Sequence, residues 1–196
     1  MIKKTINKLL NNPAILIRLR RVVENNFKKQ KEVIKKYFFY NPEDSILDLG
    51  CGSGEFSVFF QKENYVGIDI DATNIEFARK QFAKNFIVAD AKKLPFDNST
   101  FSKILVSGVF HHMSTDDCLS VFSEMKRVLK PEGSVLVMED TQSKYLLTSL
   151  IQKIDQGNFI RSHEDWSNLF ERNWSVKNKF TFKNGLCFYS TFLLDK

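Results

Sequence analysis

The most constraining feature of this 196-residue chain is a glycine-rich turn that directly follows a short apolar run. Residues 45–49 have the length and apolar character of a buried strand, and residues 50–54 read Gly-Cys-Gly-Ser-Gly. Glycine lets the backbone turn sharply and approach a ligand without a Cβ clash. The turn therefore predicts a ligand site built from backbone N–H groups, between the first strand and the following helix of an α/β sheet.

The spacing of the glycines narrows the choice of ligand. A dinucleotide fingerprint requires G-x-G-x-x-G, and counted from Gly50 its third glycine would fall at position 55, which is Glu55. The third glycine instead stands at Gly54. A phosphate-binding P-loop is excluded as well, because no Gly-Lys-Ser/Thr follows.

Apolar runs alternate with helical patterns after residue 44, which is typical of an α/β sheet. Strands are expected at 45–49, 65–69, 85–89, 101–107 and 134–138, and two more near 174–182 and 186–194, joined as a hairpin at Asn184-Gly185. Helices are expected at 56–62, 73–84, 116–129, 143–154 and 163–170. Thr115 or Asp116 is expected to cap the third of these helices, and residues 130–133 are expected to form a turn.

The N-terminal segment differs from the rest in charge and pattern. Residues 1–40 contain eleven Lys or Arg and two Glu, a balance of +9, whereas the remaining residues have a balance of −3. The net charge of the chain is therefore +6. Apolar residues recur at steps of three and four over 13–39, which predicts helix, and Asn25-Asn26 divides it into two. This segment has three interpretations: a lid over the site, an amphipathic helix on a membrane surface, or an RNA contact.

Residues 48–54, Asp-Leu-Gly-Cys-Gly-Ser-Gly, resemble motif I of class I S-adenosylmethionine-dependent methyltransferases. The resemblance runs in order from about residue 44 to residue 140. It continues through Gly-Ile-Asp-Ile at 67–70, Ala-Asp-Ala at 89–91 with Leu-Pro-Phe at 94–96, Ser-Gly-Val-Phe-His-His at 107–112 and Arg-Val-Leu-Lys-Pro-Glu-Gly at 127–133. It implies a Rossmann-like α/β fold: a seven-stranded, mostly parallel sheet with a C-terminal antiparallel hairpin and helices on both faces.

The same resemblance implies that S-adenosylmethionine binds at this site and leaves as S-adenosylhomocysteine. The implied cofactor residues are Asp48, Gly50, Cys51, Gly52, Gly54, Asp69, Ile70, Asp90, Ala91 and Ser107. Asp69 is assigned to the ribose hydroxyls, Asp90 to the adenine amino group and Asp48 to the methionine end. Asp69 also lies 19 residues beyond Gly50, and a carboxylate about 20 residues on is what a ribose diol needs.

Two histidines and one arginine are candidates for the methyl acceptor side. His111 and His112 follow the fourth strand, and a neutral imidazole can take a proton from an acceptor group. The alternative is that both only shape the cofactor pocket. Arg161, in a segment that resembles Asp-x-Gly-x-x-x-Arg of small bacterial methyltransferases, is a substrate candidate, with an exposed loop as the alternative. No metal is expected, since Cys51, Cys118 and Cys187 form no C-x-x-C pair.

We therefore expect one methyltransferase domain over residues 1–196, with 1–40 as a helical lid and 44–196 as the Rossmann-like core. The predicted reaction is methyl transfer to an O, N or S atom of a small-molecule acceptor. A tRNA or rRNA methyltransferase and a non-catalytic cofactor-binding scaffold remain as alternatives. No integral membrane segment or signal sequence is expected, so the predicted location is the cytoplasm and the predicted state a monomer or homodimer.

Overall fold

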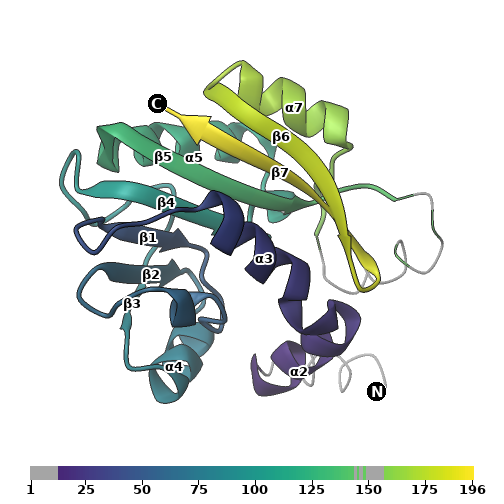
Figure 1. The fold of residues 1–196 in the computed structure, drawn as a ribbon, viewed down its shortest axis with the longest axis horizontal. Helices are drawn as coiled ribbons and strands as arrows, with labels where there is room; N and C mark the ends of the chain where they lie inside the picture. The colour runs from purple at the N-terminus through teal and green to yellow at the C-terminus, as the bar shows by residue number, and fades with distance from the viewer. Residues whose placement is uncertain (1–12, 144, 146–147, 149–156) are drawn as a thin grey trace.

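A computed structural model describes residues 13–143, 145, 148 and 157–196. It is built on a seven-stranded sheet of order β3-β2-β1-β4-β5-β7-β6 (Figure 1). The strands are β1 (Ile46–Leu49), β2 (Tyr65–Asp69), β3 (Asn85–Val88), β4 (Phe101–Ser107), β5 (Leu129–Asp140), β6 (Ser175–Asn184) and β7 (Cys187–Asp195). The first five run parallel, and β7 lies antiparallel between β5 and β6.

Helices cover both faces of this sheet, as expected from the sequence. They are α2 (Pro13–Val23), α3 (Lys28–Tyr37), α4 (Ala72–Gln81), α5 (Thr115–Val128) and α7 (His163–Glu171). Single 3-10 turns occur at η1 (Asn25–Phe27), η2 (Ser57–Phe59) and η3 (Phe110–His112). In Figure 1, α3 crosses in front of the sheet, while α5 and α7 lie behind it. The predicted seven-stranded fold with its C-terminal hairpin is confirmed.

Alternation along the central strands divides the core into two clusters. Ile104 and Val106 of β4 pack with α5 and α7, whereas Leu105 between them packs with α3 and α4. Successive side chains of a strand point to opposite faces, so a strand buried on both faces supplies both clusters. The buried middle of β4, residues 104–106, is therefore apolar on both faces of the sheet.

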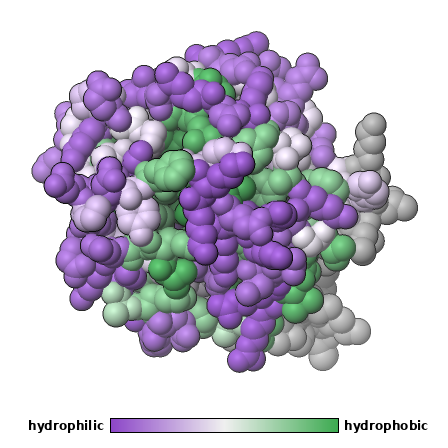
Figure 2. All heavy atoms as spheres, in the orientation of Figure 1, coloured by the Kyte–Doolittle hydropathy of each residue, from purple (hydrophilic) through white to green (hydrophobic). Residues whose placement is uncertain are grey.

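The helix α3 is part of the core. Val33, Ile34 and Phe38 are buried in the cluster that includes Leu136 of β5, while lysines such as Lys35 lie exposed on the opposite side. Figure 2 shows the same division from outside: hydrophilic side chains cover the middle of this face, over α3, with hydrophobic ones beside them. Among the described residues of the predicted N-terminal lid, α3 thus packs against the sheet, which leaves α2 as the helix available to cover a ligand site.

Three local expectations are wrong: a helix at 56–62, a helix cap and a turn at 130–133. Residues 56–62 do not form a helix; they contain only the single turn η2. The turn ends at Phe60, whose extended backbone (φ −115°, ψ 152°) brings its ring into a stack with Tyr65 at 5.5 Å between centroids. The cap of α5 is also wrong: Ser114, not Thr115 or Asp116, accepts the hydrogen bond from the Asp117 N–H.

The predicted turn at 130–133 lies inside β5. The pairing with β4 jumps from Phe101↔Leu129 to Lys103↔Ser134, so these residues form an irregularity within a longer strand. The hairpin is confirmed, with Gly185 at φ +58° between β6 and β7. The helix expected at 143–154 lies mostly outside the described residues.

The strand order sets the position of the ligand site. From β1 the chain continues to β2 on one side, and β4 then pairs on the other side of β1. A crevice forms at such a reversal, outside the carboxyl ends of the strands, and open α/β sheets bind ligands there. The glycine turn after β1 stands at this point.

Candidate active site

A cavity of about 360 Å³ opens at the carboxyl ends of the parallel strands. Four segments at or after strand ends line it: residues 48–53 at β1, 68–70 at β2, 89–91 after β3 and 107–109 at β4. Nine of the ten predicted cofactor residues lie in these segments. The exception is Gly54, which is buried behind the cavity, where an added Cβ would come 2.8 Å from the Phe86 ring.

Gly50 and Gly52 shape the turn for different reasons. Gly50 has φ +70°, and a Cβ there would lie 2.4 Å from Cγ2 of Val109, so a larger residue would be strained and would clash with the segment after β4. A Cβ on Gly52, at φ +51°, would meet no atom within 4 Å. Gly50 closes the turn against the protein, whereas Gly52 leaves open space on the cavity side.

Asp69 at the end of β2 joins two parts of the cavity wall. One of its carboxylate oxygens accepts from the Gly52 N–H at 2.9 Å, and the other accepts from the Asp71 N–H at 2.8 Å. Burial raises the pKa of Asp69 above its ordinary value, although these two hydrogen bonds oppose the shift. The carboxylate thus fixes the glycine turn and lines the cavity.

Asp48 is the most deeply buried acid of the cavity wall, with 2% of its surface exposed. The Tyr65 hydroxyl donates a hydrogen bond to its Oδ2 at 2.7 Å. Burial raises the pKa of Asp48 from 3.8 to about 7, against the lowering effect of that hydrogen bond. The carboxyl therefore changes charge near neutral pH, at the floor of the cavity.

This pKa predicts how stability depends on pH. Asp48 binds its proton more tightly in the folded chain, so between about pH 4 and 7 the folded chain holds more protons than the unfolded chain, and stability falls as pH rises through that window. Asp48→Asn removes the effect and keeps an acceptor for Tyr65. We expect Asp48→Asn to raise the free energy of unfolding relative to wild type by a larger amount above pH 7 than at pH 4. The two amounts should differ by up to about 4 kcal/mol, at about 1.4 kcal/mol for each pH unit between the ordinary and the raised pKa.

Urea melts of both proteins from pH 4 to pH 8 measure this difference directly. A difference between Asp48→Asn and wild type that stays constant over the whole range would contradict the assignment of a raised pKa to Asp48.

The remaining cofactor candidates occupy the sides and rim. Asp90 and Ala91 line the cavity after β3, and one oxygen of Asp90 accepts from the Lys92 N–H at 2.9 Å. Ile70 lies at the rim and is 71% exposed. Burial raises the pKa of the Cys51 thiol well above 9, which keeps it protonated and gives it the character of a small filler rather than a nucleophile.

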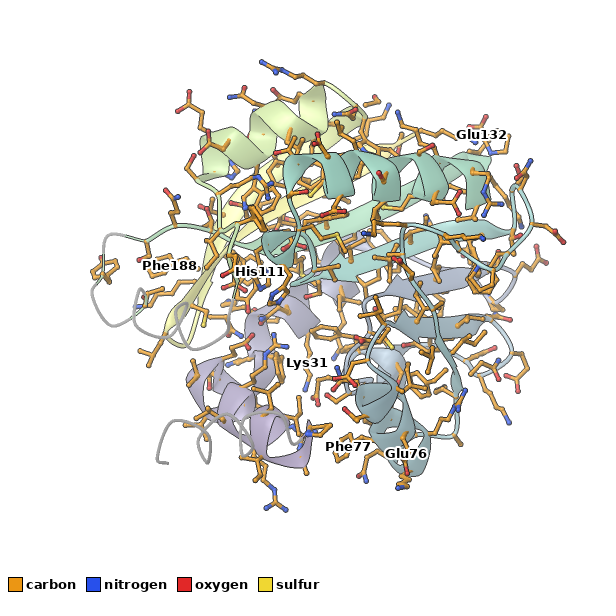
Figure 3. All side chains as sticks on the ribbon, turned by 180° about the vertical axis from the view of Figure 1, so that it is seen from behind. Lys31, Glu76, Phe77, His111, Glu132 and Phe188 are labelled. Atoms are coloured by element: carbon orange, nitrogen blue, oxygen red, sulfur yellow. The ribbon has the colours of Figure 1, made fainter. Side chains whose placement is uncertain are left out.

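The structure separates the two candidate histidines. His112 is exposed and lines the cavity beside Met113, whereas His111 is 1% exposed and is not part of the lining. Their rings lie 4.0 Å apart between centroids. In the view from behind, His111 lies at the centre of the molecule, between the sheet and the N-terminal helices (Figure 3). Of the pair, only His112 is placed to meet a ligand in the cavity.

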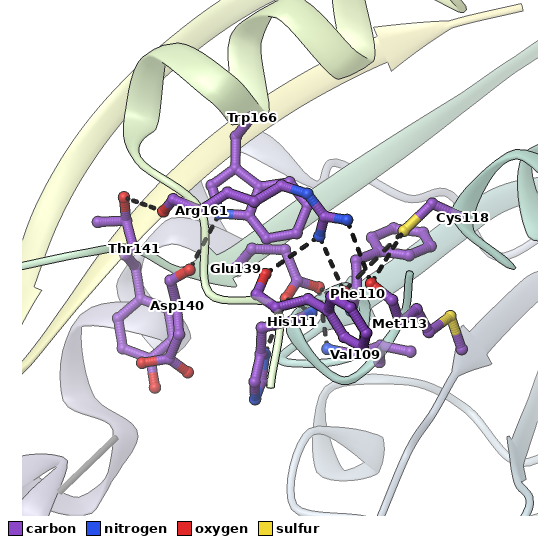
Figure 4. A network of polar contacts seen from close by, with 12 residues as sticks. Val109, Phe110, His111, Met113, Cys118, Glu139, Asp140, Thr141, Arg161 and Trp166 are labelled. Atoms are coloured by element: carbon purple, nitrogen blue, oxygen red, sulfur yellow. Dashed lines mark hydrogen bonds and ion pairs between the residues drawn. The ribbon is translucent and has the colours of Figure 1, made fainter. Parts of the chain in front are cut away.

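Sequence reasoning missed Glu139, the fully buried partner of His111. Its Oε2 lies 3.0 Å from Nδ1 of His111, and the carboxylate also accepts from backbone N–H groups of the segment after β4 (Figure 4). A signal was present in the sequence, because Glu139 is an acid near the carboxyl end of an apolar strand, as Asp48 and Asp69 are.

Arg161 lies outside the cavity lining. Its guanidinium donates to the carbonyl oxygens of Phe110, Phe159 and Met113 at 3.1–3.4 Å and to Oγ1 of Thr115 at 3.2 Å. It also lies over the Trp166 ring, 4.7 Å from the centroid. The contacts that the structure gives Arg161 are therefore with the backbone behind the site.

The N-terminal segment closes the open side of the cavity. Leu16, Ile17 and Arg20 of α2, together with Phe27, form this wall. Phe27 ends a run of three residues with positive φ, from Asn25 to Phe27, which non-glycine residues adopt at a cost of roughly 1–3 kcal/mol each. This run turns the chain between α2 and α3 and places the Phe27 ring against the cavity.

A buried polar network anchors that wall. Glu24 is 3% exposed and accepts hydrogen bonds from Arg20 at 2.6 Å, from Gln30 at 2.8 Å and from the Tyr189 hydroxyl of β7. The Leu186 N–H of the β6–β7 hairpin donates to the Val23 carbonyl at 2.9 Å. The end of α2 is thus tied to the C-terminal hairpin, a contact that no local sequence pattern signals.

In the ranges that the structure describes, no group of three or more His, Cys, Asp or Glu side chains is arranged to hold a metal ion. Within those same ranges, none of the helices combines the length and apolar character needed to span a bilayer.

Comparison with known proteins gives matches of two kinds. Residues 46–133 match the family described as a methyltransferase domain. The demethylmenaquinone methyltransferase of Thermotoga maritima is 32% identical over 117 residues, which cover 57% of this chain and 50% of that protein. The probable tRNA methyltransferase 9B of Bos taurus is 34% identical over 97 residues, 49% of this chain and 21% of that protein. The chain thus spans about half or less of the length of these relatives.

The fold also matches solved structures. Geranyl diphosphate C-methyltransferase from Streptomyces coelicolor, crystallised with Mg²⁺, geranyl diphosphate and S-adenosyl-L-homocysteine, superposes with a TM-score of 0.71 at 16% identity. The match covers 87% of this chain and 81% of that one. At this identity the likeness establishes a shared fold.

Proposed function

We propose that this chain transfers the methyl group of S-adenosylmethionine to an O, N or S atom of a small molecule. Its residues 46–133 belong to the methyltransferase-domain family. The observation that carries the proposal is the cavity itself. One side of the cavity is built from the glycine turn and three acidic residues at strand ends, and the other side is built from the apolar face of α2. The first side suits a nucleoside with a polar tail, and the second suits an acceptor.

The donor fits the first side on several observations. The open space at Gly52 leaves room for a ligand to approach the backbone, and the Asp69 carboxylate beside it suits a ribose diol. Asp90 and Ile70 line the cavity and would hold the adenine, and Asp48 and Ser107, also in the lining, would hold the amino-acid end. When bound, S-adenosylmethionine supplies an electrophilic methyl group on a positively charged sulfur.

The chain's own contribution to the reaction is positioning, exclusion of water and acceptance of a proton. Leu16, Ile17 and Phe27 provide an apolar wall that keeps water from the acceptor, and Met113 extends this wall beside His112. In the transfer, the bond from the cofactor sulfur to the methyl carbon would break as the bond to the acceptor atom forms, and the imidazole of His112 would take the proton that the acceptor O–H, N–H or S–H gives up. Alignment of the two reactants supplies the rest of the rate.

A labelling experiment tests this function. The purified chain is incubated with S-adenosylmethionine carrying a labelled methyl group and with fractionated cell extract, and each fraction is examined for label. The proposal predicts label in a small-molecule fraction and none in a reaction with boiled protein. If the chain binds the cofactor but labels no fraction, it acts as a cofactor-binding scaffold, and the proposal is wrong.

A transfer RNA acceptor is the second candidate, and one comparison favours it. The Bos taurus relative is a probable tRNA methyltransferase, and the exposed faces of α2 and α3 carry Arg18, Arg21 and several lysines. Label in the RNA fraction, lost at high salt because phosphate contacts are screened, would favour this alternative over the small molecule.

Asp69→Ala is expected to weaken binding of S-adenosylmethionine by about 1.5–3 kcal/mol, roughly 10- to 150-fold, the value of a hydrogen bond to a charged group. The variant also frees the Gly52 N–H from its carboxylate partner. Calorimetric titration with the cofactor measures the change. Asp71→Ala is the matched control, since Asp71 caps α4 two residues away and lies outside the cavity lining. Equal affinities for the two variants would remove Asp69 from the site.

A further inference from the structure

We propose that Glu139 and Arg161 are positioning residues that hold the segment after β4, residues 108–113, so that His112 faces the cavity. The identity of the reaction rests on the proposed function above, whereas the grip on the segment rests on contacts in the structure. Four of the six residues in the segment line the cavity, which makes its shape part of the site.

Glu139 holds the first half of the segment through four hydrogen bonds. One oxygen accepts from the N–H groups of Val109 and Phe110 at 2.9 and 3.0 Å. The other accepts from the His111 N–H at 3.2 Å and lies 3.0 Å from the His111 ring Nδ1 (Figure 4). Three backbone donors and one ring nitrogen occupy the acceptor sites of a carboxylate, which identifies Nδ1 as the protonated nitrogen of His111.

Arg161 holds the second half of the segment, and it donates hydrogen bonds where Glu139 accepts them. Its guanidinium donates to the carbonyl oxygens of Phe110 and Met113 and reaches Oγ1 of Thr115, just beyond the segment. Trp166, under the guanidinium, donates its Nε1–H to the carbonyl of Asp140 at 3.0 Å, which ties Arg161 back to β5. The N–H groups at the start of the segment thus meet an anion, and the carbonyl groups at its end meet a cation.

These contacts determine the direction of His112. His111 is enclosed: its carbonyl accepts from the Phe159 N–H at 2.9 Å, and a Cβ on Gly157 would come 2.5 Å from its ring. With His111 fixed toward Glu139, its ring packs against the ring of His112, 4.0 Å away between centroids, and His112 lines the cavity. A displacement of about 1 Å in a reacting group costs on the order of 10²-fold in rate.

Glu139→Gln tests the grip with little change of volume, because the amide places a donor where a backbone or ring N–H already points. The chain has three histidines, so ¹³C-histidine labelling of the full chain gives a spectrum that is simple to assign. In wild type we expect a slowly exchanging His111 Nδ1–H signal, and a His112 signal that shifts when S-adenosylhomocysteine is added. Glu139→Gln should lose both, while the signal of His163, which contacts Ser190 on β7, should stay in place.

Kinetics separate positioning from stability. The acceptor is the extract fraction that takes up label in the reaction with wild type. With this acceptor, Glu139→Gln and Arg161→Gln should each lower kcat by about 10²-fold and leave KM for S-adenosylmethionine within about threefold of the wild-type value. Asp44→Asn is the matched control. The Asp44 carboxylate also accepts a hydrogen bond from a backbone N–H, that of Asn41, but Asp44 lies at the amino ends of the strands. The variant should lower the thermal midpoint and leave kcat unchanged.

Arg161→Gln also covers the case in which Glu139→Gln does not fold. Folded variants that keep the wild-type His112 shift and turnover would overturn the proposal. If wild type labels no extract fraction, the proposed function fails, and the His111 and His112 signals still decide whether Glu139 and Arg161 hold the segment.

Discussion

Replacing His112 by alanine is expected to lower turnover by about 10²–10⁴-fold, the contribution of a positioned general base. Of the two candidate histidines, His112 is the one that lines the cavity. His112 belongs neither to the glycine turn nor to the pair of acids assigned to the nucleoside, Asp69 and Asp90. The affinity for the cofactor should therefore remain within a few-fold of wild type. Turnover on the labelled fraction and calorimetry with S-adenosylmethionine measure the two quantities separately.

The pH profile provides an independent check on His112. Only neutral imidazole accepts a proton, so the wild-type rate should rise with pH as the general base loses its proton, and His112→Ala should lose that rise. His163→Ala is the control, because His163 contacts Ser190 on β7 and is not part of the cavity lining. Near-normal turnover of His112→Ala would leave positioning of the two reactants as the whole explanation.

Deletion of residues 1–23 is expected to reduce turnover by at least about 10²-fold, because it removes the α2 wall that aligns the acceptor and excludes water. The deletion retains Phe27, α3 and every residue assigned to the donor. Ile17 is the one buried residue of α2 and belongs to neither core cluster, and of the α2 residues only the partly buried Val23 packs against a cluster, so most of the core remains and the protein should fold. Calorimetry should find cofactor affinity reduced only modestly, and the labelling assay should find transfer lost.

A point variant refines the deletion. Ile17→Ser alters the face of α2 that lines the cavity, whereas Leu19→Ser alters a residue that is 42% exposed and outside the lining. The first should lower turnover and the second should not. Full activity of the deleted chain on the acceptor would contradict the role of α2.

The parts of the fold that follow from local chemistry could be predicted from the sequence. The glycine turn after an apolar strand needs only its own residues, and it correctly located the cavity, while the family resemblance supplied the candidate cofactor residues, nine of which line that cavity. The resemblance to S-adenosylmethionine-dependent methyltransferases is confirmed by the family match over residues 46–133. The Asn184-Gly185 hairpin formed as predicted because the left-handed backbone at Gly185 is a local property.

What escaped prediction depends on contacts between distant segments. The pattern of α3 is that of any amphipathic helix, and only the fold shows that its apolar face joins the core rather than the cavity wall. Glu139 lies 28 residues from His111, and no periodicity links them. Residues 56–62 carry a helical pattern, but the ring of Phe60 packs on Tyr65 and draws the backbone into an extended form.

Calorimetric titration of the purified chain with S-adenosylmethionine, S-adenosylhomocysteine and NAD tests the central claim most directly. The account predicts that the first two ligands bind at one site per chain, compete with one another, and bind more weakly to Asp69→Ala. It predicts that NAD does not displace them, because Glu55 stands where a dinucleotide fingerprint needs its third glycine. Preferential binding of NAD, or no binding of either S-adenosyl compound, would contradict the account.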